Sequence, residues 1–180
     1  GSYEGGIYGW TNDVQLTDAE PPSFGVSSLV YSFKAHIGSI KAVAIDESGE
    51  VLATGGQDEY VRLFSVSTRR DRGVLSQHTG TVTALAFFKS SHLLSASVDG
   101  VVCIWRAHDW LCLHVLGGHK GPVTSIAIHP SGRMAFSGSR DHTLRLWNLV
   151  EGRCAFITRP GIPKHSEIEH ICWSPSGKLY

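Results

Sequence analysis

Apolar and polar residues alternate in short runs along most of this chain, and short polar turns separate the runs. The stretch from His78 to Val115 is the clearest example, with four runs of five to seven residues. Alternation with a period of two is typical of strands with one buried face, and a turn such as Asp99-Gly100 joins antiparallel neighbours. The pattern predicts a unit of four antiparallel strands in this stretch.

The same unit recurs at intervals of 41 or 42 residues. A histidine near its start, an aspartate in its middle turn and an aromatic residue closing its third strand keep the same phase over three copies. These residues are His36, His78 and His119, then Asp58, Asp99 and Asp141, then Phe64, Trp105 and Trp147. A period of ~40–45 residues with these features is typical of the four-stranded blades of a β-propeller. We expect an all-β chain with blades over residues 36–76, 77–118 and 119–160.

Small residues crowd the second strand of each unit, at 53–56, 95–97 and 137–139. The inner strands of a propeller converge on its axis and leave little room for side chains. The composition therefore favours these second strands as the crowded, inner ones.

The N-terminal part of the chain shows an incomplete unit. Residues 7–10 and 29–33 resemble the third and fourth strands of a closing blade over 3–35. The segment from Asp13 to Ser28 between them exceeds the usual connection of ~4–6 residues, so it is either a binding insertion or disordered. Residues 1–2, Gly-Ser, resemble a cloning remnant.

The C-terminal part, 161–180, resembles the start of a further blade. Residues 168–173 resemble a first strand, and 175–177 repeat the Pro-Ser-Gly turn of 130–132. Closing a propeller removes its exposed edges, and rings have about 4–8 blades. We expect the chain to be about half of a ring whose parent protein continues beyond Tyr180.

The charge balance points to proteins as partners. Lys+Arg and Asp+Glu both total 16, so the formal net charge is zero. There is no overall basic field to attract nucleic acid or an anionic membrane, and no apolar run approaches the ~18–20 residues that span a bilayer. We expect protein partners, no membrane and no small-molecule substrate.

The cysteines and histidines show no metal-site spacing. Cys103, Cys112, Cys154 and Cys172 include no C-x-x-C pair, and the repeated histidines lie whole units apart. Buried free thiols in a reducing compartment fit this spacing better than disulfides or zinc. We expect no cofactor and no metal.

The order of histidine, Ser/Thr, aspartate and tryptophan resembles the WD-repeat family, in which these side chains form a hydrogen-bonded tetrad. Carried onto this sequence, the tetrads are Thr54, His36, Asp58 and Phe64; Ser95, His78, Asp99 and Trp105; and Ser137, His119, Asp141 and Trp147. Because Phe64 has no indole N–H, we expect the first blade to be the least constrained. The residue after the aromatic is not aspartate in any copy, but that position lies outside the tetrad.

Ser, His and Asp together also suggest a hydrolase triad. A catalytic site is needed once, whereas this trio recurs in every unit, and no G-x-S-x-G motif is present. The structural interpretation is favoured, and we expect no catalytic residue.

Two sets of residues are candidates for partner contact. Gln57, Val98, Arg140 and Lys120 flank the tetrad turns and should project from the rim that WD-repeat proteins commonly use. Arg69, Arg70 and Arg72 lie between the third and fourth strands of the first blade. They form either a solvated loop or a contact for RNA or an acidic protein.

Within this family, residues 99–105, 118–124, 128–132 and 143–157 resemble the PAK-interacting WD-repeat proteins. The resemblance implies seven blades, the nucleus and nucleolus, and a role in large ribosomal subunit assembly with pre-ribosomal factors and rRNA contact. It also implies the alternative of an adaptor that binds and restrains a p21-activated kinase. A histone-tail or other peptide reader is a further alternative.

Overall fold

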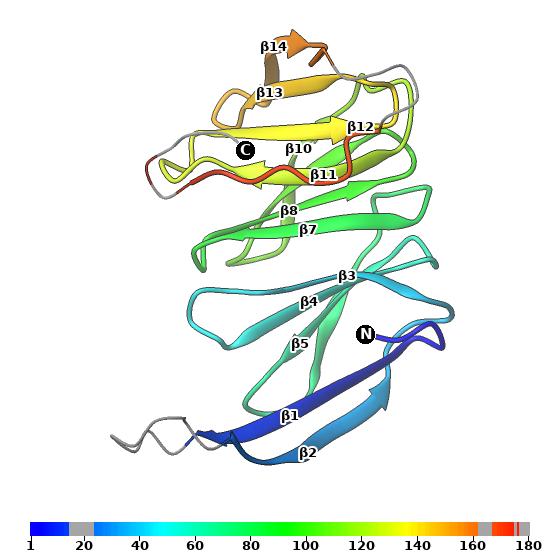
Figure 1. Ribbon diagram of the computed structural model, residues 1–180, viewed down its shortest axis with the longest axis vertical. Coiled ribbons are helices and arrows are strands. Elements are labelled where there is room, and N and C mark those ends of the chain that lie inside the picture. Colours follow the sequence, from blue (N-terminus) through cyan, green and yellow to red (C-terminus); the bar gives the residue numbers. More distant parts are fainter. Residues whose placement is uncertain (15–23, 162–166, 175, 177–180) are drawn as a thin grey trace.

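The computed structural model describes residues 1–14, 24–161, 167–174 and 176, and the regular elements there are all β-strands. Three sheets of four strands and one sheet of two strands are stacked along the molecule (Figure 1). Within each four-stranded sheet, neighbours in sequence are neighbours in space and run antiparallel. The expected all-β fold built from four-stranded blades is confirmed.

The first blade contains β3 (Ile40–Ile45), β4 (Val51–Gly56), β5 (Val61–Ser65) and β6 (Asp71–Leu75). The second contains β7 (Val82–Phe88), β8 (His92–Ser97), β9 (Val102–Arg106) and β10 (Leu111–Leu116). The third contains β11 (Val123–Ile128), β12 (Met134–Ser139), β13 (Leu144–Asn148) and β14 (Arg153–Thr158).

The two-stranded sheet pairs β1 (Gly6–Val14) with β2 (Phe24–Lys34). Both strands are longer than the sequence indicated, and they include the two ends of the segment from Asp13 to Ser28, which was expected to be either a binding insertion or disordered. Residues 15–23 lie outside the described part of the chain. Ser2, taken from the sequence for a cloning remnant, accepts a hydrogen bond from the Ile40 N–H over 3.1 Å.

The first strand of each blade lies against the first strand of the neighbouring blade, and second strands also contact that strand. β3, β7 and β11 are adjacent in the stack (Figure 1). The small residues of the second strand lie where the neighbouring layer packs closely. A Cβ at Gly55 would lie 2.5 Å from Val82 Cγ1, so this position is small because the next blade packs on it.

The first strand of each blade has a β-bulge at the same position, which changes the direction of a side chain. The register of the first and second strands shifts around Lys41, Thr83 and Thr124. A bulge turns the extra residue out of the normal alternation. The Thr83 hydroxyl thereby lies 2.6 Å from the carbonyl oxygen of Val123 in the next blade, and the Thr124 hydroxyl bonds the carbonyl of Ile168. These bonds join neighbouring layers.

The segment from Glu167 to Ser174 runs beside β11 without forming the first strand that the sequence suggested (Figure 1). Ile168 and Ile171 pack on Ala127, and the Ile171 N–H donates to Ser125 Oγ over 3.1 Å. The contacts are made largely through side chains, so no continuous backbone ladder results. The suggested turn at 175–177 lies mainly outside the described residues.

The cysteines differ in burial. All four are free, but Cys103 alone is buried, and Cys172 is exposed. The expectation of four buried thiols is therefore wrong, although burial raises the pKa of the Cys103 thiol. No helix in the described residues is long and apolar enough to cross a membrane.

Candidate functional site

The second blade contains a four-membered polar network. His78 Nδ1 lies 3.1 Å from Asp99 Oδ2, and His78 Nε2 lies 2.8 Å from Ser95 Oγ. The Trp105 indole N–H donates to the same Ser95 oxygen over 2.8 Å. Because that oxygen accepts from tryptophan, its own proton is free for His78 Nε2, and Nδ1–H then donates to the carboxylate. One neutral tautomer satisfies the whole network.

The third blade repeats this geometry. His119 lies 3.0 Å from Asp141 and 2.7 Å from Ser137, and Trp147 donates to Ser137 over 2.7 Å. The Thr143 hydroxyl adds a bond to Asp141 over 2.6 Å. Ser137 is fully buried, as are its counterparts Ser95 and Thr54. A substrate carbonyl has no path to these hydroxyls, so the arrangement suits structure rather than acyl transfer.

The first blade has a shorter network. His36 bridges Asp58 at 2.7 Å and Thr54 at 2.8 Å. Phe64 supplies no donor and instead packs on Phe33 of β2, with ring centroids 4.9 Å apart. The aromatic position therefore links the first blade to the two-stranded sheet.

A second layer of hydroxyls supports the networks and was missed from the sequence. Ser97 and Ser139 each donate to a carbonyl in the segment entering their blade, over 2.8 and 3.0 Å. Each also accepts the N–H of the tetrad aspartate at 3.1 Å. Their 42-residue spacing is a signal that could have found them, and the first blade has Gly56 instead.

Burial and hydrogen bonding shift the titration of the third network. Burial lowers the pKa of His119 from its ordinary value of 6.5, against the opposing pull of Asp141. Burial would raise the pKa of Asp141, but hydrogen bonds from Thr143, Lys120 N–H and His119 hold it well below its ordinary value. The pKa of Asp58 is lowered in the same way, with His36 as its main hydrogen-bond partner.

Stability should therefore fall on acidification. The unfolded chain takes up a proton at His119 near pH 6.5 that the native state resists, so stability is complete above that pH and declines below it. A second decline is expected below the ordinary aspartate value of 3.8, where unfolded Asp141 protonates first. Urea denaturation across this range measures both steps. His119→Gln should remove the upper step, and an unchanged upper step in that variant would contradict the assignment.

The strand ends define two rims. The His–Asp rim carries the turns between second and third strands, and there the N–H groups of Gln57, Val98 and Arg140 bond carbonyls of the entering segments at 2.9–3.0 Å. The opposite rim carries the turns between first and second and between third and fourth strands. Val66, Ala107 and Leu149 join those two sets of turns through bonds of 2.8–2.9 Å.

The candidate contact residues are divided between these rims. Gln57, Val98, Lys120 and Arg140 are exposed on the His–Asp rim, and Arg140 pairs with Glu167 over 3.0 Å. Arg69 and Arg70 lie in the β5–β6 turn on the opposite rim. Arg72 belongs to β6 rather than to the turn, so the structure does not bring the two sets together.

An open pocket of about 510 Å³ on the His–Asp rim gathers positive charge. Lys120, Arg145 and Arg159 line it together with Asp141 and Ile157. Arg145, which the sequence did not single out, is held by a 2.6 Å bond from its guanidinium to the carbonyl of Gly118. Within the described residues no cluster of His, Cys, Asp and Glu could hold a metal ion.

Known proteins resemble this chain over most of its length. A p21-activated protein kinase-interacting protein 1-like protein of Danio rerio is 43% identical over 83% of the chain and 39% of its own length. Protein MAK11 of Saccharomyces cerevisiae is 35% identical over 88% of the chain and 42% of its own length. Shk1 kinase-binding protein 15 of Schizosaccharomyces pombe is 32% identical over 85% and 43%, respectively. The chain spans about two fifths of the length of these relatives.

A family model described as WD domain, G-beta repeat matches residues 27–65, 70–106 and 110–148. Each match starts in or just before the last strand of one sheet and ends with the third strand of the next. Each sequence repeat therefore contributes the last strand of one sheet and the first three strands of the next sheet, and this links neighbouring sheets. Together with the three four-stranded sheets, these matches show that the chain belongs to the WD-repeat family.

Proposed function

We propose that this chain is a protein-binding part of an adaptor that turns nothing over and works in assembly of the large ribosomal subunit. The observation that carries the non-catalytic part is the threefold use of one buried network. Ser95 and Ser137 lie out of reach of any substrate, and their histidines serve strand arrangement. Binding of partners would therefore take place on the surface, chiefly on the two rims.

The assembly role rests on the resemblance to the PAK-interacting WD-repeat proteins. The sequence of the segment from Asn148 to Ile157 supports it, because the propeller fold does not require most of these residues. Val150 is exposed in the β13–β14 turn, and Phe156 and Ile157 are exposed on β14. The role places the protein in the nucleus and nucleolus, among pre-ribosomal factors.

The cationic pocket on the His–Asp rim is the proposed contact for those partners. Lys120, Arg145 and Arg159 would meet acidic protein side chains or rRNA phosphates, because exposed cations bind both. The exposed Gln57 and Val98 extend this surface over the neighbouring blades. Arg69, Arg70 and Arg72 would make a separate contact on the other side.

Depletion of the protein in cells tests the role. Large-subunit precursors should decline while small-subunit precursors stay unchanged, as measured by gradient sedimentation and pre-rRNA analysis. Re-expression with Lys120→Glu and Arg159→Glu should restore the precursors less well than Lys41→Glu, an exposed control on β3. An unchanged precursor profile after depletion would refute the assembly role.

Binding of a p21-activated kinase is the second candidate. The name of the Danio rerio relative favours it, and the name of the Schizosaccharomyces pombe relative, a binding protein of the Shk1 kinase, favours a kinase partner. Affinity purification followed by mass spectrometry separates the candidates, because assembly factors, kinases and histones are distinct sets of partners. Recovery of a kinase without pre-ribosomal proteins would support the second candidate in place of the first.

A further inference from the structure

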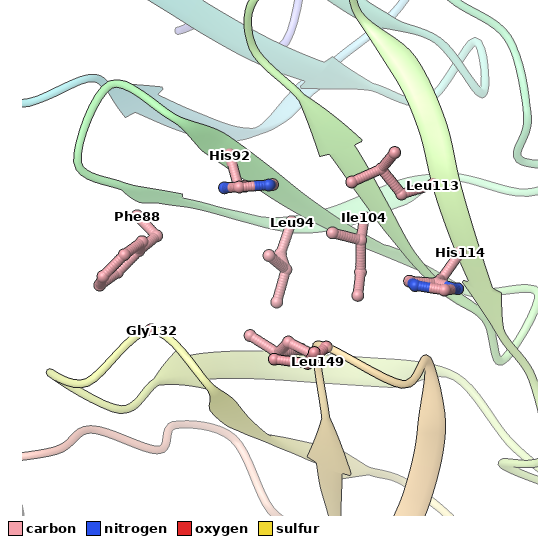
Figure 2. A pocket seen from close by; sticks show the side chains of 9 residues that line it. Phe88, His92, Leu94, Ile104, Leu113, His114, Gly132 and Leu149 are labelled. Carbon is pink, nitrogen blue, oxygen red and sulfur yellow. The ribbon is translucent and has the colours of Figure 1, made fainter.

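An apolar pocket of about 290 Å³ opens between the second and third blades on the opposite rim (Figure 2). Its floor is made of the buried side chains Leu94 and Ile104. Leu113 and His114 of β10 form one wall, and Leu149 of the third blade faces them across the gap (Figure 2). Sites for drug-sized ligands occupy ~300–1,000 Å³, so this volume suits one large side chain.

The blade repeat explains why the pocket lies here. Arg69, Trp110 and Gly152 occupy the same position of the β5–β6, β9–β10 and β13–β14 turns, all with positive φ, at 57°, 59° and 66°. Trp110 packs on the apolar cluster shared by the first and second blades. At the next interface the turn offers Gly152, which has no side chain to place there.

Other contacts keep the gap open. The Phe88 ring lies against Gly132 and the His114 ring against Gly152, so closely that a Cβ at either glycine would clash. These two contacts brace the blades on both sides of the pocket. Leu113 is the bulge residue of β10, which turns its side chain inward. Leu94 and Ile104, which are 1% and 2% exposed, lie beneath these contacts as the floor of the pocket.

Two cations adjoin residues of the pocket lining in the sequence, and the Nζ of one of them, Lys89, lies 5.7 Å from the centroid of the Phe88 ring. Lys89 follows Phe88, and Arg133 follows Gly132, its carbonyl accepting the Leu149 N–H at 2.9 Å. Within the part of the chain that the structure describes, neither cation forms an ion pair. The carboxylates of Asp109 and Glu151, in the β9–β10 and β13–β14 turns, are already paired with Arg106 at the end of β9 and Arg153 at the start of β14.

We propose that this pocket binds one tryptophan-sized apolar side chain from an acidic segment of a partner protein. The apolar floor of the pocket indicates that the partner side chain is apolar, and Trp110 in the same position at the neighbouring interface indicates its size. Lys89 and Arg133 define the flanking charge, because complementary charges favour encounter and orientation. The site lies across the molecule from the cationic pocket near Lys120, so the inference goes beyond the assembly role.

A synthetic peptide with one tryptophan between aspartates is the probe. On titration, the imidazole NMR signals of His92 and His114 should shift and saturate. Replacing the peptide tryptophan with alanine should weaken binding at least about tenfold, as loss of a buried anchor does. Replacing its aspartates with lysines should weaken it several-fold. No saturable shift, or equal affinity of the alanine peptide, would overturn the proposal.

Matched variants locate the site. Leu113→Asp should weaken binding at least about tenfold, whereas Leu111→Asp, exposed on the same strand, should not. Lys89→Glu with Arg133→Glu should weaken binding several-fold without disturbing the core, since both side chains are exposed. Lys120→Glu on the His–Asp rim should leave peptide affinity unchanged. Self-association that Leu113→Asp abolishes would assign the pocket to a second copy instead and refute the proposal.

This test and the depletion experiment can fail separately. Peptide binding together with an unchanged precursor profile would support the pocket proposal and refute the assembly role. A loss of large-subunit precursors without peptide binding would support the assembly role and refute the pocket proposal.

Discussion

Replacing Trp147 with alanine should lower the free energy of unfolding by about 3–5 kcal/mol, as large-to-small changes of buried aromatics do. The side chain is 2% exposed and belongs to the cluster that joins the second and third blades. The change removes the aromatic bulk and also the indole donor to Ser137. Urea denaturation followed by far-UV circular dichroism measures the loss.

Trp147→Phe is the matched control. Phenylalanine keeps much of the ring but removes the 2.7 Å bond to Ser137, so a loss of about 1 kcal/mol is expected from the bond, plus a small cavity term. The first blade already carries Phe64 at this position and still joins His36 to Thr54. A phenylalanine variant as unstable as the alanine variant would contradict this division between packing and hydrogen bonding.

His119→Ala should lower the free energy of unfolding by about 1–3 kcal/mol, because Asp141 and Ser137 lose a partner where water cannot fully replace it. The cost should not add to that of Trp147→Phe, since both side chains bond Ser137 Oγ. A double-mutant cycle by urea denaturation measures this coupling. Additive losses would contradict a shared network.

The same variant separates structure from catalysis. If His119→Ala left the melting temperature unchanged and abolished an ester hydrolysis activity of the chain, the structural interpretation would be wrong. Ser95→Ala in the second blade is the parallel test, because its network has the same geometry.

Most of the fold could be predicted because its information is local. Strand alternation and turn residues act within a few positions, and no hydrogen bond of these networks joins residues more than 24 apart in sequence. The histidine, aspartate and aromatic phases therefore identified the blades and the residues that now lie within hydrogen-bond distance. Ser97 and Ser139 obey the same phase and were within reach of the same reasoning.

The mistakes concern contacts between blades. Small residues in β4, β8 and β12 indicated crowding, and the structure shows that at Gly55 the crowding comes from Val82 of the next blade. Residues 168–173 have strand-like alternation, yet they bind β11 largely through side chains. A small residue in the sequence indicates that its position is crowded, but it does not indicate which neighbouring residue lies against it.

By itself, the sequence determined the four-stranded unit and its threefold repetition, because period-two alternation and turn chemistry act along the chain. The members expected in each polar network came from the resemblance to the WD-repeat family. Only the tertiary structure decided which strands meet between blades, which rim carries each arginine, and that a pocket opens beside Leu113. Those features depend on where bulges turn Thr83 and Leu113 and on the meeting of His114 with Gly152, residues that belong to different repeats. Side-chain direction and the fit between layers are set in three dimensions, so no pattern along one strand specifies them.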